Sequence, residues 1–202
     1  MGHETTEGPA GVRAFFAARA AGWDAKFAGD GPRYAAAVAA MRLPEGAAVL
    51  DAGCGTGRAL PALREAVGPG GLVLGADLTP EMLEVAAHEG RDAYGTLLLA
   101  DAARLPLRDG GLDAVFAAGL VSHMRGQEEG LRELARVVRP RGTLALFHPI
   151  GRAALAARKG HTLGPDDARA EPNLRPLLAA AGWRLTSYED EPERYLALAE
   201  RA

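Results

Sequence analysis

The stretch with the most chemical content lies near the first quarter of the chain, where a carboxylate is followed by glycines at alternate positions. It reads VLDAGCGTG over residues 49–57, so that Asp51 is followed by Gly53, Gly55 and Gly57. Glycine permits a tight turn and removes side chains from it, so a ligand can lie directly against the backbone. Such a turn between a buried strand and a helix is typical of the ligand crevice at the carboxyl edge of an open α/β sheet.

Two further acids make this signal more specific. Asp77 ends an apolar run at residues 72–76 and follows the glycines at a distance from which an acid can reach ribose hydroxyls. Asp101 ends another apolar run at residues 96–100. Acids at the ends of three successive parallel strands indicate one shared groove. For Asp51 or Asp77 taken alone, a helix cap or a turn acid is the alternative.

The rest of the chain supplies the elements that position these acids. Apolar runs predict strands at residues 47–51, 72–76, 96–100, 112–117, 143–148, 183–189 and 194–199, and helices are expected at 58–67, 79–88, 128–138 and 173–181. This alternation predicts an α/β fold with a Rossmann-like, doubly wound, seven-stranded sheet. Residues 190–193 are too few for a parallel crossover, so we expect a mostly parallel sheet with one antiparallel C-terminal strand.

Composition and charge narrow the class of protein. The net charge of -3 and the pI of about 6.0 argue against a protein that binds by neutralising phosphates. No apolar run reaches membrane-spanning length, and residues 1–9 lack the order of a signal peptide. The single cysteine, Cys54, suits a reducing compartment. We therefore expect no membrane insertion and a cytoplasmic location.

The motifs resemble, in order and spacing, those of class I S-adenosylmethionine-dependent methyltransferases. DAGCGTG (51–57) resembles their first motif, and GADLTPEML (75–83) resembles their second with its ribose-binding acid. ADAARLPLRDGGLDAVFAAG (100–119) is similar to their adenine-contact and fourth-strand region, and LRELARVVRPRGTLALF (131–147) to the segment through strand five. The resemblance is to the broad group that includes ubiquinone- and menaquinone-type methyltransferases.

This resemblance implies a binding role for each motif, with S-adenosyl-L-methionine as cofactor and S-adenosyl-L-homocysteine as product. Asp51 would lie near the cofactor's amino end, Asp77 would bind both ribose hydroxyls, and Asp101 would accept the adenine amino group. Gly119 would line the floor near the sulfonium. The implied cofactor-binding residues are Asp51, Gly53, Cys54, Gly55, Gly57, Asp77, Leu78, Met82, Asp101, Ala102 and Gly119.

We expect the 202 residues to form a single methyltransferase domain. Within it, residues 10–43 would be an N-terminal helical cap and residues 45–150 the cofactor-binding core. Residues 149–172 would be a mobile loop, and residues 173–202 a C-terminal helix and hairpin. In the cap, helical spacing continues as far as Phe27, and a turn at 29–32 precedes a second helix.

Two histidines and three aromatic residues are candidates for the acceptor side of the groove. His123 follows the fourth expected strand and His148 ends the fifth, so either could act as a base if the acceptor must lose a proton. The alternative is a loop cap for His123 and a hydrogen-bonded turn residue for His148. Trp23, Phe27 and Tyr34 are expected to line a substrate pocket, with ordinary helix packing as the alternative.

Rival classes of protein fit these residues less well. A dinucleotide fold requires GxGxxG, but here Arg58 occupies the place of the last glycine. No Gly-Lys-Ser or Gly-Lys-Thr follows the glycines, which excludes a phosphate loop. The segment AAGLVSH (117–123) lacks both the pattern of enzymes that methylate nucleic-acid amino groups and the acid cluster of catechol-type enzymes.

We therefore predict a small-molecule acceptor, no nucleic-acid partner, no metal, and a monomer or homodimer. The motifs do not specify the acceptor or its reacting atom. A non-catalytic sensor or accessory protein that binds the cofactor or its demethylated product is the alternative function, because a fold alone does not establish catalysis.

Overall fold

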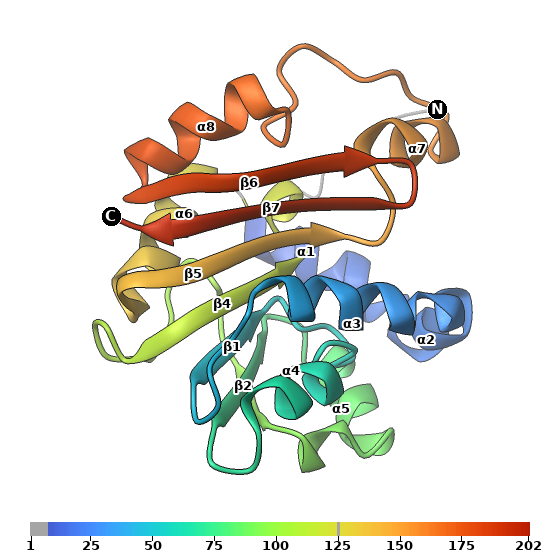
Figure 1. Cartoon of the computed structure of the whole chain (residues 1–202). Helices are drawn as coiled ribbons and strands as arrows, with labels where there is room; N and C mark the ends of the chain where they lie inside the picture. The colour runs from blue at the N-terminus through green and yellow to red at the C-terminus, as the bar shows by residue number, and fades with distance from the viewer. Residues whose placement is uncertain (1–7, 125) are drawn as a thin grey trace.

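The computed structural model describes residues 8–124 and 126–202, which form helices around one seven-stranded sheet (Figure 1). The strands are β1 (Ala48–Ala52), β2 (Leu72–Asp77), β3 (Thr96–Leu99), β4 (Leu112–Ala118), β5 (Val138–His148), β6 (Trp183–Glu191) and β7 (Arg194–Arg201). The α-helices are α1 (Gly8–Ala17), α2 (Trp23–Lys26), α3 (Gly31–Ala40), α4 (Leu60–Val67), α5 (Pro80–His88), α6 (Gln127–Val137), α7 (Arg152–Arg158) and α8 (Glu171–Ala180). Short 3-10 helices are η1 (Ala20–Gly22), η2 (Ala28–Asp30), η3 (Arg91–Ala93) and η4 (Val121–His123).

The strand order confirms the expected doubly wound sheet. It is β3-β2-β1-β4-β5-β7-β6, and β1 to β5 pair in parallel with their neighbours in this group. β7 runs antiparallel to both β5 and β6, as its arrowhead in Figure 1 shows. The carboxyl ends of the parallel strands therefore meet at one edge, near α2 and α7 in Figure 1.

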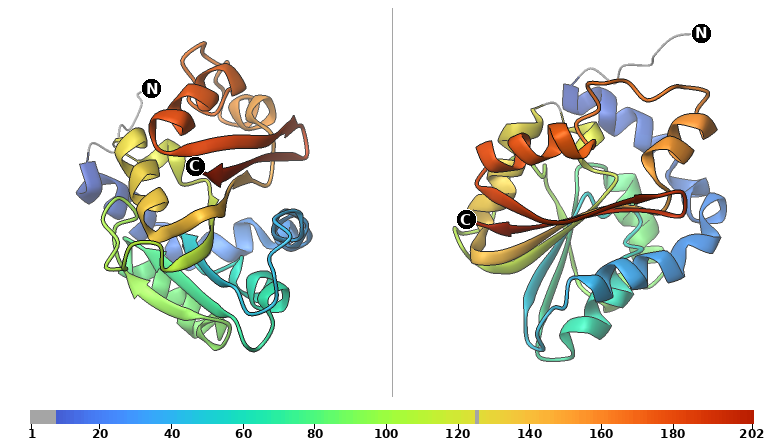
Figure 2. Two further views of the ribbon diagram at one scale, coloured as in Figure 1. Left: turned by 60° about the vertical axis from the view of Figure 1, so that its left-hand side comes forward. Right: turned by 45° about the horizontal axis from the view of Figure 1, so that its top comes forward.

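Helices cover both faces of the sheet, so each face has its own apolar core (Figure 2). On one face α3 and α4 bury Val38, Leu60 and Leu63 against the sheet. On the other face α6 and α8 bury Leu131 and Leu174. Within residues 8–124 and 126–202, no helix has both the length and the apolar character to cross a bilayer.

Two differences from the expected elements come from proline and from a register shift. The helix expected from Arg58 begins at Leu60, with Pro61 in its first turn. A proline is tolerated there because the first-turn N–H groups have no partner within the helix. Residues 139–142, which lie before the strand expected at 143–148, belong to β5, as an irregularity in which Arg141 has a φ of 64°.

The N-terminal segment and the start of α5 also differ in detail. The continuous helical spacing expected as far as Phe27 is interrupted after Ala17, so α1 and the four-residue α2 are separate. Thr79 occupies the N-cap position of α5, as expected, but its hydroxyl makes no capping hydrogen bond. The hydroxyl instead stabilises the charged form of Asp77.

A matched pair of leucines tests this description of the core. Leu144 in β5 is fully buried and Leu99 in β3 is 62% exposed. We expect Leu144→Ala to lower the free energy of unfolding by about 2–5 kcal/mol, because it removes buried apolar surface and leaves a cavity. Leu99→Ala should change it by less than about 1 kcal/mol. Urea denaturation followed by circular dichroism measures both, and equal losses would contradict the assigned packing.

Candidate functional site

The turn after β1 has a backbone conformation that suits glycine. Gly53, Gly55 and Gly57 have φ values of 68°, 55° and 77°. A Cβ at Gly53 would lie 2.9 Å from Cδ1 of Leu120, and one at Gly57 would lie 2.9 Å from Cδ1 of Leu60. A side chain at either position would both strain the backbone and clash with a neighbour. Glycine is therefore required in this turn both by the backbone conformation and by the close packing.

Gly119, just after β4, connects this turn with the end of β5. It has a φ of 67°, and its N–H donates to the carbonyl of Phe147 at 2.8 Å. A Cβ at Gly119 would lie 3.9 Å from Cδ2 of His148. The next residue, Leu120, packs over Gly53. A ligand that lies on Gly53 therefore contacts Leu120 or turns its side chain aside.

Asp77 ties the end of β2 to the glycine turn. Its Oδ2 accepts the N–H of Gly55 at 2.8 Å, and its Oδ1 accepts the N–H of Thr79 at 2.8 Å. Burial raises the pKa of Asp77, and these hydrogen bonds act in the opposite direction. Each carboxylate oxygen has more than one lone pair, so Asp77 can hold the turn and still accept hydrogen bonds from a ligand.

Asp51, near the end of β1, is a buried carboxylate without a counter-charge. The residue is 2% exposed, and its Oδ1 has no hydrogen-bond partner in the described part of the chain. Burial, and then the negative charge of Asp77, raise the pKa of Asp51 to about 8. Burying an unpaired charge is costly, so a cation beside Asp51 would be strongly favoured.

Asp101 lies beside the end of β2, because the N–H of the preceding Ala100 donates to the backbone carbonyl of Asp77 at 2.9 Å. Its Oδ1 accepts the N–H of Ala103 at 2.9 Å. Ala102, between the two, is buried. The three acids predicted from the sequence therefore follow one another along the ends of β1, β2 and β3.

The remaining residues of the predicted cofactor set lie around the turn in different orientations. Met82 of α5 is buried, with its Sδ 4.0 Å from where a Cβ of Gly55 would be. Leu78 is partly exposed beside Asp77. Cys54 is buried, and its Sγ lies 3.2 Å from where a Cβ of Gly75 would be, so this side chain faces β2. Burial raises the pKa of the Cys54 thiol.

An aromatic cover lies above the carboxyl edge, formed by Phe16, Trp23 and Phe27. The rings of Phe16 and Trp23 are 5.5 Å apart, and those of Trp23 and Phe27 are 4.9 Å apart. The ring of Tyr34 packs on Phe147 at 5.0 Å, in the core beneath α3, and the guanidinium of Arg58 lies over it at 4.9 Å. Burial raises the pKa of Tyr34 to about 12. The same guanidinium lies 5.8 Å from the Phe27 ring, so Arg58 connects Tyr34 with the aromatic cover.

A set of polar contacts, which we call the lid latch, fastens this cover to the glycine turn. Thr56 donates its hydroxyl to Oδ1 of Asp24 at 2.6 Å, and Arg91 pairs with Oδ2 of Asp24 at 2.6 Å. Arg91 also donates to the carbonyl of Thr56 at 2.6 Å, and Arg58 donates to the carbonyl of Phe27. Asp24, Thr56 and Arg91 were not predicted as site residues from the sequence, although Thr56 lies inside the glycine motif.

His148 has the geometry of a proton acceptor. Its Nδ1 is 2.8 Å from the carbonyl oxygen of Ile150, to which it can donate, and 3.2 Å from the backbone nitrogen of Ile150, from which it can accept. The shorter contact favours a proton on Nδ1 that is donated to the carbonyl. Nε2 then carries the lone pair. Burial lowers the pKa of His148, so the ring is neutral near pH 7.

The ring of His123, at the end of η4, contacts an aromatic ring of the N-terminal segment. Its ring packs edge-on against Phe16 at 5.0 Å. Burial, followed by the charges of Lys159, Arg169 and His148, lowers the pKa of His123 to about 4. A histidine with so low a pKa is a weak base, so of the two candidates His148 is better suited to take a proton.

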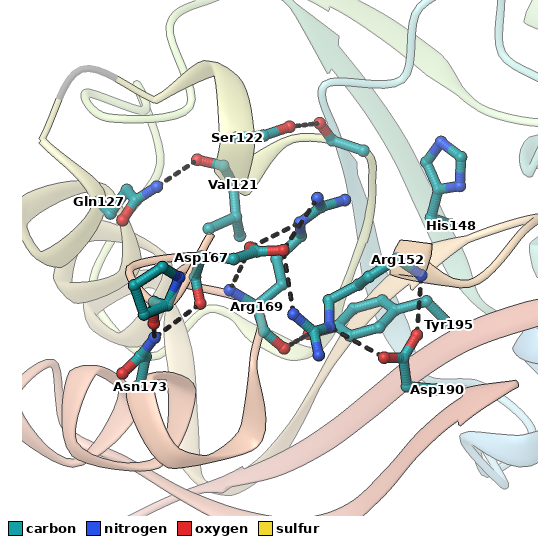
Figure 3. Close-up of polar contacts among 12 residues, drawn as sticks. Val121, Ser122, Gln127, His148, Arg152, Asp167, Arg169, Asn173, Asp190 and Tyr195 are labelled. Carbon is teal, nitrogen blue, oxygen red and sulfur yellow. Dashed lines mark hydrogen bonds and ion pairs between the residues drawn. The ribbon is translucent and has the colours of Figure 1, made fainter. Parts of the chain in front are cut away.

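A small hollow lies between the ends of β4 and β5 and the start of β7. Its lining residues are Ala117, Gly119, Leu120, Val121, Leu146, Phe147, His148, Arg169 and Tyr195. Most of these are apolar, while Arg169 and His148 are polar. Arg169 comes from the segment after α7 that was expected to be a loop, and nothing in its local sequence pattern distinguished it. Figure 3 draws the side chains of Arg169 and His148 in one close-up.

Two other features do not suggest a site. A wider, open depression is lined by Arg132, Arg136 and Arg201 with small residues near Gly182, at the amino end of β5. Each of these arginines is bonded to an acid or a carbonyl, so none is available there. In residues 8–124 and 126–202, no three His, Cys, Asp or Glu side chains gather to hold a metal ion.

Comparisons with known proteins agree with this geometry. Residues 50–146 match the family described as "Methyltransferase domain". A demethylmenaquinone methyltransferase of Roseiflexus sp. (strain RS-1) is 30% identical over 179 residues, which cover 76% of this chain and 75% of that protein. Methyltransferase GfsG of Streptomyces halstedii is 39% identical over 111 residues, covering 53% of this chain and 39% of that protein.

A solved structure supports the same assignment. The crystal structure of a SAM-dependent methyltransferase from Aquifex aeolicus has a TM-score of 0.66 and 25% identity, covering 80% of this chain and 85% of that chain. The chain therefore belongs to the class I S-adenosylmethionine-dependent methyltransferases, in the broad group that includes the ubiquinone- and menaquinone-type enzymes. Several curated relatives are much longer, and the matched region spans only 22% to 39% of their length.

The buried carboxylate of Asp51 predicts a pH-dependent stability. Because the pKa of Asp51 is raised from 3.8 to about 8, the folded state binds one more proton than the unfolded state between these values. Stability is therefore present below the lower value and is lost as pH rises towards the upper one, by at most about 1.4 kcal/mol per pH unit. We expect Asp51→Asn to stabilise the protein more at pH 7.5 than at pH 5, by at least about 1 kcal/mol.

Urea denaturation at the two pH values measures this difference. Asp92→Asn removes a carboxylate at an exposed position of η3 and serves as the control. If the effect of Asp51→Asn were the same at both pH values, the assigned burial of an unpaired carboxylate would be wrong.

Proposed function

We propose that this chain transfers a methyl group from S-adenosyl-L-methionine to a small-molecule acceptor. The observation that carries the proposal is the buried, unpaired carboxylate of Asp51 beside a turn of three glycines. The raised pKa of Asp51 favours a proton there until a cation lies beside it, and the cofactor has a positively charged amino group at its methionine end. The residues present therefore fit the cofactor that the family uses.

The remaining contacts follow from the order of the strand ends. Asp51 would face the amino group, while Gly53 and Gly55 would let the methionine portion approach the backbone. The lone pairs of Asp77 that are not used by Gly55 and Thr79 would accept the ribose hydroxyls. Asp101 would accept the adenine amino group, with Leu78, Met82 and Ala102 as apolar neighbours and Gly119 below the reacting end.

When bound, the cofactor supplies a methyl group that is already activated for displacement. The chain then has to align the acceptor and exclude water, and alignment alone can lower the barrier by several kcal/mol. The aromatic cover, held by the lid latch, excludes water from this edge of the sheet. Where the acceptor must lose a proton, Nε2 of His148 would receive it, because Nδ1 is already bonded to Ile150.

A small molecule is a better candidate acceptor than a nucleic acid. Some relatives of this chain are named as tRNA methyltransferases, and they match only about half of it. The net charge of -3 provides little attraction for phosphates. The hollow beside His148 is mostly apolar, and its volume of about 10 Å³ means that an acceptor must displace lining side chains to enter it. The single, buried Cys54 agrees with a reducing, cytoplasmic location.

Methyl transfer and cofactor sensing predict different results in one experiment. The protein is incubated with methyl-labelled S-adenosyl-L-methionine and a panel of small metabolites, and S-adenosyl-L-homocysteine is measured as product. An enzyme forms the product in a way that depends on the acceptor. A sensor binds the cofactor, as shown by calorimetry, and forms no product with any acceptor.

The ribose contact is tested by Asp77→Asn. The variant loses the charge that strengthens hydrogen bonds to ribose hydroxyls, so we expect S-adenosyl-L-homocysteine to bind about tenfold to a hundredfold more weakly. Calorimetry measures the affinity. Asp109→Asn, at a side chain that is 80% exposed, is the control and should bind as tightly as the wild type. Unchanged affinity in Asp77→Asn would refute the ribose assignment.

The role of His148 is tested with an acceptor that must lose a proton. We expect His148→Gln to lower kcat at least about a hundredfold with little change in KM, which is the usual size of a general-base contribution. Because the pKa of His148 is below its ordinary value, the wild-type rate should decline only below pH 6.5. His88→Gln, at an exposed residue, is the control. A kcat unaffected by His148→Gln would exclude it as the base.

A further inference from the structure

Arg169 lies across the carboxyl edge of the sheet from the three acids of the site. The acids Asp51, Asp77 and Asp101 lie at the ends of β1, β2 and β3, as described above. Beyond β4, Arg169 and His148 line the hollow, and Asp167 pairs with Arg169. The hollow lies where the acceptor would be if the proposed function is correct, and the inference below rests on that function.

Arg169 is anchored through one edge of its side chain. Nε and Nη2 lie 3.2 Å and 3.4 Å from the carboxylate of Asp167, and Nη1 makes no hydrogen bond within the described residues. Its backbone carbonyl accepts the hydroxyls of Tyr188 at 3.0 Å and Tyr195 at 3.3 Å. The side chain is only 19% exposed, so Arg169 has a fixed position beside the hollow.

The two arginines differ in how many carboxylates they contact. Arg152 pairs with Asp190 at 2.9 Å and with Asp167 at 3.1 Å, so it is neutralised from two sides. Asp167 is therefore shared between two guanidinium groups, as Figure 3 shows. Arg152 holds the segment in place, and Arg169 keeps Nη1 free to donate a hydrogen bond beside the hollow.

The residues that line the hollow indicate that the rest of the ligand is apolar. Leu120, Val121, Leu146, Phe147 and Tyr195 present mostly apolar surface, and His148 lies on the same wall near Gly119. We propose that the acceptor is a small molecule with an apolar body and a carboxylate, and that Arg169 binds this carboxylate. The acceptor's reacting atom then lies between His148 and the cofactor side of the groove.

Matched acid and amide probes test this proposal. Benzoate, phenylacetate, 4-hydroxybenzoate and hexanoate are each compared with their primary amides. Binding to protein saturated with S-adenosyl-L-homocysteine is measured by saturation-transfer difference NMR. We expect at least one of the acids to bind the wild type about tenfold more tightly than its amide, because a hydrogen bond to a charged group is stronger than one to a neutral group. Arg169→Gln should remove this preference.

Two further variants separate binding from folding. Arg169→Lys keeps the charge and should retain part of the preference for acids. Arg175→Gln removes an equal charge at an exposed position of α8, where the arginine pairs with Glu171, and should behave as the wild type. Affinity for S-adenosyl-L-homocysteine should be unchanged in all three variants, which shows that each is folded.

The outcomes distinguish this inference from the proposed function. Equal binding of acids and amides by the wild type, no binding of any acid, or a preference that survives Arg169→Gln would overturn the inference, while cofactor binding would stand. If Arg169→Gln weakened S-adenosyl-L-homocysteine binding instead, Arg169 would contact the cofactor's own carboxylate, and the inference would also be wrong. Failure of the wild type to bind S-adenosyl-L-homocysteine would refute the proposed function itself.

Discussion

A carboxylate held in the interior without a counter-charge is the constraint around which this site is built. Asp51 is on a central strand, and its position is fixed because β1 pairs with strands on both sides. The neighbouring acid Asp77 cannot move away, since both of its oxygens hold backbone amides. The like charges are therefore kept close together by the backbone. The fold tolerates this repulsion by favouring a proton on Asp51 until a cation replaces it.

Methyl transfer would change the charge of the donor's sulfur but not that of its amino group. A donor on the acidic side would therefore keep its amino group beside Asp51 after the methyl group has left. On the other side of the groove, Arg169 would hold the acceptor's carboxylate while its reacting atom changes. The lid latch, in which Asp24 and Arg91 meet at 2.6 Å, fastens the N-terminal segment over the side where the donor would lie. Donor and acceptor would thus be held by separate parts of the chain.

The sequence predicted the parts of the structure that depend on local pattern. The strands, the glycine turn and the acids at Asp51 and Asp77 follow from apolar runs and from backbone requirements that act over a few residues. Arg169 and Asp24 could not be predicted, because their partners Asp167 and Thr56 matter only after distant segments pack together. The position of Tyr34 could not be predicted for a different reason. An aromatic residue on a helix can face either a pocket or the core, and Tyr34 packs on Phe147.

The reversal of β7 has a consequence for the order in which the groove is completed during synthesis. Because β7 runs against β5, its first residues lie beside the last residues of β5, and Tyr195 is paired with His148. One wall of the hollow therefore comes from the final tenth of the chain, whereas the glycine turn and its acids are made within the first half. A nascent chain therefore contains the glycine turn and its acids early. The hollow beside His148 is complete only after β6 and β7 have paired.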